Sequence, residues 1–142
     1  MFSGTDVVMA GYSGTPLPKK LGIKPGLRVR LRNAPAEVLR ELRFELSQCE
    51  LADSTPADFA MVFTKSRADL STEFSCAAKM LAPAGTLWIG WPKKSSGVAT
   101  DLDENVIREI GLKAGLVDVK VCAITEVWSG LKFVRRVKDR KK

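Results

Sequence analysis

The sequence predicts a single three-layer α/β domain with a mostly parallel sheet and a C-terminal antiparallel hairpin. Its 142 residues suit one domain with a sizeable core. Continuous apolar stretches at 58–64 and 86–91 alternate with helical patterns of about a dozen residues, which indicates parallel strands covered on both faces. The last two expected strands, 117–124 and 131–137, are separated by six residues. That connection is too short for a crossover and predicts antiparallel pairing.

The first third of the chain predicts an arm, a strand and a helix. Residues 1–20 are rich in Gly, Ser and Pro, so we expect a flexible arm there, with the domain over 21–137 and a basic tail over 138–142. Alternation predicts a strand at 27–32, and residues 49–51 suit a short second strand. Pro35 fits the first turn of a helix whose apolar stripe would be Val38, Leu39, Leu42 and Leu46.

The remaining elements have recognisable boundaries. Ser66 and Asp69 form a capping-box pattern ahead of a helix with an apolar face of Leu70, Phe74, Ala77 and Leu81. Gly85 should end that unit, and Pro92 should end the strand that follows. A further helix is expected from about Asp101 to Ala114, with Gly115 after it and with Val106, Ile107 and Ile110 facing inward.

The residue inventory excludes several chemistries. The sequence contains no histidine, which removes Ser-His-Asp and Cys-His catalysis and His-containing zinc sites. It has no C-x-x-C pair, so no metal site is predicted, and no cofactor is predicted either. Its three cysteines are expected to be small buried side chains in a reducing compartment. Because no secretory signal or membrane-length apolar window is apparent, we expect a cytoplasmic location.

The net charge of +7 is concentrated at one end of the chain. Residues 132–142 carry seven basic side chains and one acidic side chain, a net of +6, which leaves +1 for the rest. A solvated basic tail is one interpretation. A contact with the phosphate backbone of a nucleic acid is the other.

Part of the chain resembles a known enzyme fold. KMLAPAGTLWIGW (79–91) is similar to the helix, Leu-x-Pro-x-Gly, strand segment of class I S-adenosylmethionine-dependent methyltransferases. ENVIREIGLKAGLVDVKVCAI (104–124), with the strand after it, resembles the closing helix and reversed hairpin of that fold. Over residues 58–137 the resemblance implies a Rossmann-like, methyltransferase-like architecture.

The sequence departs from that resemblance where the cofactor would bind. Methyltransferases of this class carry a glycine-rich turn after the first strand, whereas VRLRNAPAEV (29–38) has no glycine. An acidic residue that ends the second strand usually holds the ribose, and Glu50 and Asp53 are the candidates here. The chain is short for such an enzyme, so elements of the usual fold should be missing.

A second resemblance covers most of the chain from Gly11 onward. The words GYSGTPLPKKLGIKPG, WPKK, SGVATDL and WSGL together are similar to a family of small, uncharacterised bacterial proteins known as a domain of unknown function. That resemblance implies a bacterial cytoplasmic protein and carries no activity.

The candidate site lies at the carboxyl ends of the expected strands. In an open parallel sheet, ligands bind near the point where strand order reverses. Three turns, 32–37, 63–69 and 91–101, should gather there. Lysines, hydroxyls and an indole in these turns would suit a small anionic ligand with an apolar part. The candidate ligand-binding residues are Asn33, Lys65, Ser66, Trp91, Lys93, Lys94, Ser95, Ser96 and Thr100.

The same residues have a structural interpretation. Thr100 or Asp101 could cap the next helix, with Asp103 or Glu104 completing the box, and these acids would repel an anion. Lys93 and Lys94 would then extend into solvent. Trp128 would cover the end of the sheet rather than stack on a ligand.

Three functional hypotheses follow. The first is a reduced methyltransferase-like domain, not an active enzyme, that binds a small anionic ligand or a protein partner. The second is an S-adenosylmethionine-dependent methyltransferase with an altered cofactor turn, in which Asn33 contributes polar contacts. The third is nucleic-acid association through the basic tail.

Overall fold

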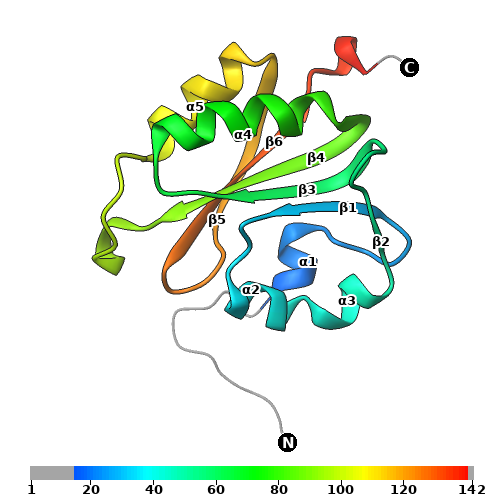
Figure 1. Ribbon diagram of the computed structural model, residues 1–142, viewed down its shortest axis with the longest axis horizontal. Coiled ribbons are helices and arrows are strands. Elements are labelled where there is room, and N and C mark those ends of the chain that lie inside the picture. Colours follow the sequence, from blue (N-terminus) through cyan, green and yellow to red (C-terminus); the bar gives the residue numbers. More distant parts are fainter. Residues whose placement is uncertain (1–14, 141–142) are drawn as a thin grey trace, which may run out of the picture.

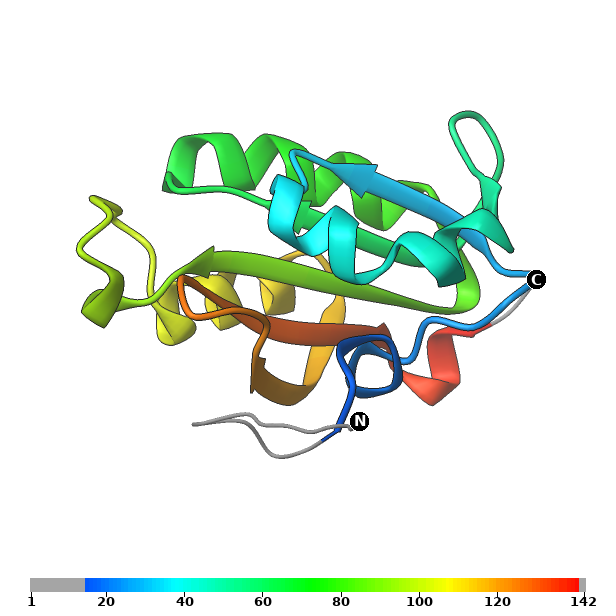
Figure 2. The ribbon, with the colours of Figure 1, turned by 90° about the horizontal axis from the view of Figure 1, so that it is seen from below.

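The computed structural model describes residues 15–140, which form one six-stranded sheet with helices on both faces (Figures 1 and 2). The elements in chain order are α1 (Leu17–Leu21), β1 (Arg28–Arg32), α2 (Ala36–Glu41), α3 (Arg43–Ser47), β2 (Glu50–Leu51), β3 (Ala57–Phe63), α4 (Arg67–Lys79), β4 (Leu81–Pro92), η2 (Lys94–Ser96), α5 (Glu104–Lys113), β5 (Leu116–Ala123), β6 (Trp128–Arg135) and η3 (Val137–Asp139).

The sheet has the predicted topology. Its strand order is β2-β1-β3-β4-β6-β5, with β1 to β4 parallel and β6 antiparallel to both of its neighbours. Helices α4 and α5 cover one face, and α1, α2 and α3 cover the other (Figure 1). This arrangement confirms the three-layer α/β class and the antiparallel hairpin. The last strand begins at Trp128 rather than 131, so residues 124–127 connect the hairpin.

Each face of the sheet has its own apolar core. On the α4–α5 face, Phe74 and Phe133 are fully buried and meet edge to face with ring centroids 5.1 Å apart. On the opposite face, Trp88 is fully buried among side chains from β1, β3 and the three short helices. Its indole N–H donates a 2.9 Å hydrogen bond to the carbonyl of Leu21, which ties α1 to the centre of the sheet.

The N-terminal arm is shorter than predicted. Residues 17–20 were expected in the arm but belong to α1, and residues 1–14 lie outside the described residues. Leu17 and Leu21 are one helical turn apart and both are buried, and Pro18 is tolerated in the first turn because its missing N–H has no partner there. The four-residue spacing of Leu17 and Leu21 across Pro18 was the signal that the Gly- and Pro-rich composition hid.

The predicted helix from Pro35 is divided into α2 and α3 at Leu42. Val38 and Leu42 are buried as predicted, and Leu46 packs partly against the same core. Leu39 is 40% exposed, so its predicted inward position is wrong. It lies about 100° around the helix from Val38, and the break at Leu42 does not turn it back toward the sheet.

Strand β4 begins earlier than predicted. It includes Leu81, which was expected on the face of the preceding helix, and it runs through Gly85 without ending there. The pairing with β3 shifts register between Ala57 and Phe59, and this irregularity accommodates the residues before Thr86. The end of the strand at Pro92 is as predicted.

The cysteines are only partly as expected. All three are free thiols, with Cys49 and Cys122 half-buried. Cys76 is exposed, which contradicts the prediction of a buried side chain. It lies on the α4 surface, where its sulfur accepts a 3.2 Å hydrogen bond from the Arg30 guanidinium. No helix among residues 15–140 is long and apolar enough to cross a membrane.

An ion pair at the start of β1 gives a pH prediction. Arg28 donates through Nε and Nη2 to both carboxylate oxygens of Asp58, at 3.1 and 3.0 Å, and these hydrogen bonds lower the pKa of Asp58. A lowered pKa stabilises the fold above the ordinary carboxyl value near 4, and this contribution is lost as pH falls through the lower folded value.

Asp58→Asn should therefore be less stable than the parent at pH 7, and the difference should shrink below pH 4. Urea midpoints of both proteins at several pH values measure it. If the difference in stability between the two proteins does not change with pH, the ionisation of Asp58 does not contribute to stability.

Candidate functional site

The strand order places a topological switch point between β1 and β3. From β1 the chain moves outward to β2, and it then returns so that β3 lies on the other side of β1. The turns that follow β1 and β3 therefore leave the sheet side by side at its carboxyl edge. Ligands of open α/β sheets bind at such a position.

Asn33 stands at this switch point in a left-handed backbone conformation. Its φ is +59°, the only positive φ of a residue other than glycine in the described range. Its side-chain amide donates a 3.4 Å hydrogen bond to the carbonyl of Phe63, the last residue of β3. Asparagine adopts this conformation more readily than other side chains. The turn after β1 thus has a glycine-like backbone without a glycine.

The two acidic candidates near β2 lie away from the switch point. Glu50 is in register with Arg28, the first residue of β1, and so lies toward the amino edge. Asp53 comes two residues after the end of β2 and is exposed, in the short loop that returns to the start of β3 (Figure 1). Asn33, in contrast, follows the last residue of β1.

The N-terminus of α4 is already capped by the protein's own oxygens. Ser66 Oγ accepts from the Asp69 backbone N–H at 3.1 Å, as the capping-box pattern predicted. Asp101 Oδ1 accepts from the Arg67 N–H at 2.8 Å. A carboxylate at this position offsets the helix dipole and disfavours a second anion.

The predicted cap of the last helix is wrong. Asp103, not Thr100 or Asp101, is the N-cap of α5, and its carboxylate accepts from the Val106 N–H at 2.9 Å. Thr100 is engaged elsewhere, since its hydroxyl donates to the Lys65 carbonyl at 2.5 Å. Thr100 and Asp101 therefore join the loop after β4 to the loop after β3.

The segment 93–98 has the hydrogen bonds of a local turn. Ser96 Oγ donates to the Lys93 carbonyl at 2.6 Å and accepts from the Val98 N–H at 3.2 Å. Lys94 and Ser95 are exposed, and Lys93 is half-buried. These contacts are the ones expected for a polar turn whose serines satisfy backbone groups.

Neither tryptophan at this edge presents a free ring. Trp91 is 7% exposed and packs in the core beneath α4 and α5. Trp128 is buried on the opposite face, where it meets Phe63 edge to face at a centroid distance of 5.3 Å. Both indoles therefore stabilise the end of the sheet by packing.

The structure thus brings four of the nine candidate residues together through hydrogen bonds at or next to the loop after β3: Asn33, Lys65, Ser66 and Thr100. Lys93 and Ser96 form a separate turn beyond β4, and Trp91 belongs to the core. Sequence patterns did not identify the left-handed Asn33 or the contact of Asp101 with α4. An asparagine directly after an alternating strand was the available signal for the first.

Comparisons with known proteins identify the architecture. No known family and no curated protein matches the sequence. Among solved structures, the magnesium protoporphyrin IX methyltransferase of Synechocystis PCC 6803 with bound S-adenosylhomocysteine superposes with a TM-score of 0.57 at 13% identity, over 79% of this chain and 75% of that one.

The fold is methyltransferase-like. A TehB-like S-adenosylmethionine-dependent methyltransferase from Corynebacterium glutamicum superposes with a TM-score of 0.55 at 8% identity, over 89% of this chain and 91% of that one. A putative methyltransferase from Thermoplasma acidophilum gives 0.52 at 10% identity, over 92% and 77%. At such identities the likeness of this methyltransferase-like domain to these proteins concerns the fold alone.

Proposed function

We propose that this methyltransferase-like domain binds S-adenosylmethionine at the carboxyl edge of β1 and β3 and acts as a methyltransferase. The observation that carries the proposal is the left-handed Asn33 at the switch point, held by its bond to Phe63. Residues whose backbone is held in a sparsely populated conformation cluster at ligand sites. The similar solved structures, several of them S-adenosylmethionine-dependent methyltransferases, support this choice of ligand.

The turn after β1 would meet such a cofactor through its backbone. The amide of Asn33 is engaged with Phe63, so the backbone of the turn is the part that would face the ligand. When bound, S-adenosylmethionine supplies the electrophilic methyl group.

The second candidate function is binding without methyl transfer. The Thr100–Lys65 hydrogen bond joins the loop after β3 to the loop that carries Lys93 and Lys94, and this favours a small anionic ligand or a protein partner on the lysine side. Asp101 at the N-terminus of α4 opposes an anion there, which places this candidate second.

Calorimetric titration of the pure protein with S-adenosylmethionine and S-adenosylhomocysteine tests the proposal. We expect saturable micromolar binding of both. Asn33→Gly should keep it, because glycine adopts the same backbone freely, while Asn33→Val should weaken it at least tenfold, because a β-branched residue resists positive φ.

The two acidic candidates near β2 supply controls. Glu50→Ala and Asp53→Ala should both leave binding unchanged, because neither residue belongs to the turns that follow β1 and β3. A tenfold loss of binding in either variant would contradict the assigned edge.

Methyl transfer is measured separately. A cell extract incubated with the protein and methyl-labelled S-adenosylmethionine should gain label that the Asn33→Val protein does not transfer. Binding without transfer would support the second candidate. Absence of binding to both cofactor forms would end the proposal.

A further inference from the structure

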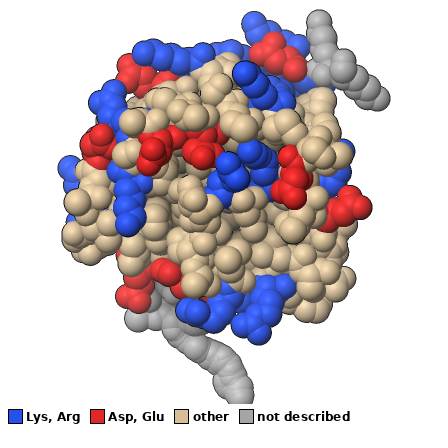
Figure 3. All heavy atoms as spheres, viewed as in Figure 1, with Lys and Arg blue, Asp and Glu red and all other residues tan. Residues whose placement is uncertain are grey.

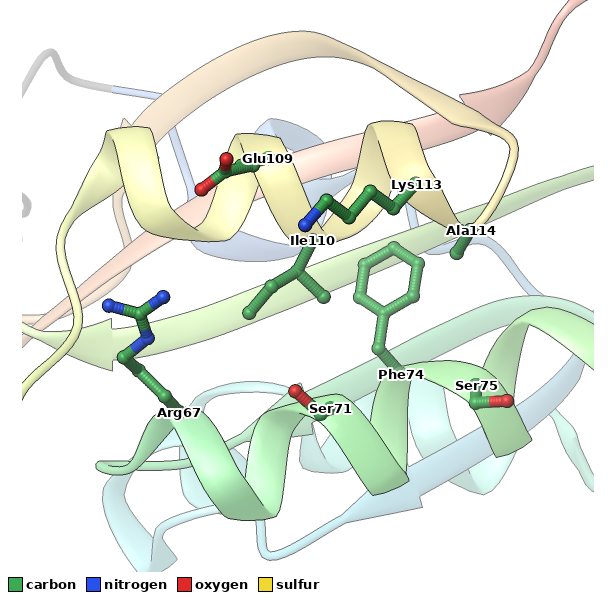
Figure 4. Close-up of a pocket in the computed structure, with 8 residues that line it drawn as sticks. All are labelled: Arg67, Ser71, Phe74, Ser75, Glu109, Ile110, Lys113 and Ala114. Atoms are coloured by element: carbon green, nitrogen blue, oxygen red, sulfur yellow. The ribbon is translucent and has the colours of Figure 1, made fainter.

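A groove runs between α4 and α5 on the outer surface of the domain (Figure 4). Its volume is about 380 Å³. Phe74 and Ile110 form its floor, and Ser71 and Ser75 line the α4 side. Arg67 reaches toward α5 at one end of the groove, and Lys113 extends from α5 over Ile110 (Figure 4).

A second hollow of about 250 Å³ continues the groove toward the C-terminal end of α4. The two share Ser75 and Ala114, and the second adds Lys79 and Arg135. Arg135 donates at 2.7 Å to the carbonyls of Ala78 and Leu81. This residue anchors the C-terminal segment, which continues as the single turn η3, beside the end of the groove.

Most of the net charge of the protein lies along this path. The groove, the second hollow and residues 136–140 contain seven basic residues and two acidic residues, Glu109 and Asp139, a net of +5 out of the +7 of the whole chain. Figure 3 shows Lys and Arg side chains along the upper margin of the molecule, with a few Asp and Glu side chains among them. The basic tail predicted from the sequence is therefore one part of a longer surface.

Two acidic side chains of the same helices, Glu73 and Glu104, pair with residues outside the groove, whereas Glu109 lines it. Glu73 of α4 pairs with Arg32 of β1 at 3.3 Å. Glu104 of α5 pairs with Arg108, which also binds Asp118 of β5. In contrast, six cations of the path have no ion pair within the described part of the chain: Arg67, Lys79, Lys113, Arg136, Lys138 and Arg140.

We propose that this surface, the α4–α5 groove together with residues 135–140, binds the phosphate backbone of a nucleic-acid duplex. Helix α4 has 13 residues and is about 20 Å long, which spans about six phosphates of one duplex strand. Ser71 and Ser75 offer hydroxyls of the kind that contact phosphate oxygens.

The side chains of the groove favour a duplex over an acidic protein or a single strand. A protein interface depends on apolar anchors, but Phe74 is completely buried beneath the groove. Single-strand binding uses exposed aromatic rings, and the groove presents none among its described residues. Binding of lysine and arginine side chains to a nucleic-acid backbone strengthens with the density of phosphate charges, and that density is higher in a duplex than in a single strand.

Fluorescence anisotropy with a 20-base-pair RNA duplex, a single strand of the same length and poly-glutamate tests this assignment over a range of salt. The parent should bind the duplex most tightly. If all six cations contact phosphates, log Kd should change by about 5 per tenfold change in salt.

Charge-matched triple variants locate the contact. Arg67→Ala/Lys79→Ala/Lys113→Ala should lower the salt slope by about 3 and weaken binding at least tenfold, and Arg136→Ala/Lys138→Ala/Arg140→Ala should do the same. The control Lys19→Ala/Arg40→Ala/Arg43→Ala removes equal charge from the helices of the opposite face and should leave the slope within about 1 of the parent. Circular dichroism confirms folding of each variant.

Four results would overturn the proposal: no duplex binding by the parent at low salt, an equal loss in the control triple, tighter binding of the single strand, or poly-glutamate binding as tight as that of the duplex. None of these depends on S-adenosylmethionine, so the cofactor proposal stands or fails separately.

Discussion

Trp88→Ala should lower the free energy of unfolding by about 3–5 kcal/mol, enough to unfold much of the protein at 37 °C if its stability is typical of a small domain. Trp88 is fully buried at the centre of β4, and its indole donates the hydrogen bond that holds α1 against the sheet. The substitution would leave a large cavity and an unpaired carbonyl at Leu21.

Trp88→Phe separates the two contributions. It keeps an aromatic ring in the core but removes the donor to Leu21, so we expect a loss of about 1–3 kcal/mol. Urea denaturation followed by circular dichroism measures both variants. Equal stability of Trp88→Ala and the parent would show that α1 and the core on that face do not depend on this side chain.

Gly111→Ala should destabilise the protein by about 1–3 kcal/mol, although alanine is normally the better helix former. A Cβ at this position of α5 would lie 2.1 Å from Cε2 of Phe133. That ring is completely buried and is held edge to face by Phe74, so it has no free space into which to move. Gly111 is therefore needed for close packing of α5 on β6.

A double-mutant cycle tests this reason. Phe133→Leu removes the far edge of the ring, so Gly111→Ala should cost much less in that background than in the parent. Denaturant midpoints of the four proteins give the coupling energy. The same cost in both backgrounds would show that the helix backbone, and not the ring, limits position 111.

The sequence predicted the parallel strands and the final hairpin because continuous apolar strands and short connections constrain topology directly. The ends of helices that depend on tertiary contacts were harder to predict from the sequence. Asp103 rather than Asp101 caps α5, because Asp101 instead caps the helix on the other side of the loop. Which of two nearby carboxylates caps α5 thus depends on where α4, more than 30 residues earlier in the chain, begins, and local sequence patterns do not contain that information.

In the candidate site, too, local features could be predicted from the sequence and tertiary contacts could not. The position of Asn33 after β1 could be read from the sequence, but the bond of its side chain to the Phe63 carbonyl, 30 residues away, could not. The α4–α5 groove was not predicted, because its cations come from two helices and the last strand. The charge run at the C-terminus indicated only the end of that surface.

Chemical-shift mapping of the isotope-labelled protein tests the central claim, that S-adenosylmethionine binds at the switch point. Titration with S-adenosylhomocysteine should shift the amide signals of residues 33–34 and 64–66, with little change in α5 or in α4 after its first residue, Arg67. Saturation of these shifts at micromolar ligand would support the assigned site. Shifts confined to the α4–α5 groove, or no shifts at millimolar ligand, would contradict it.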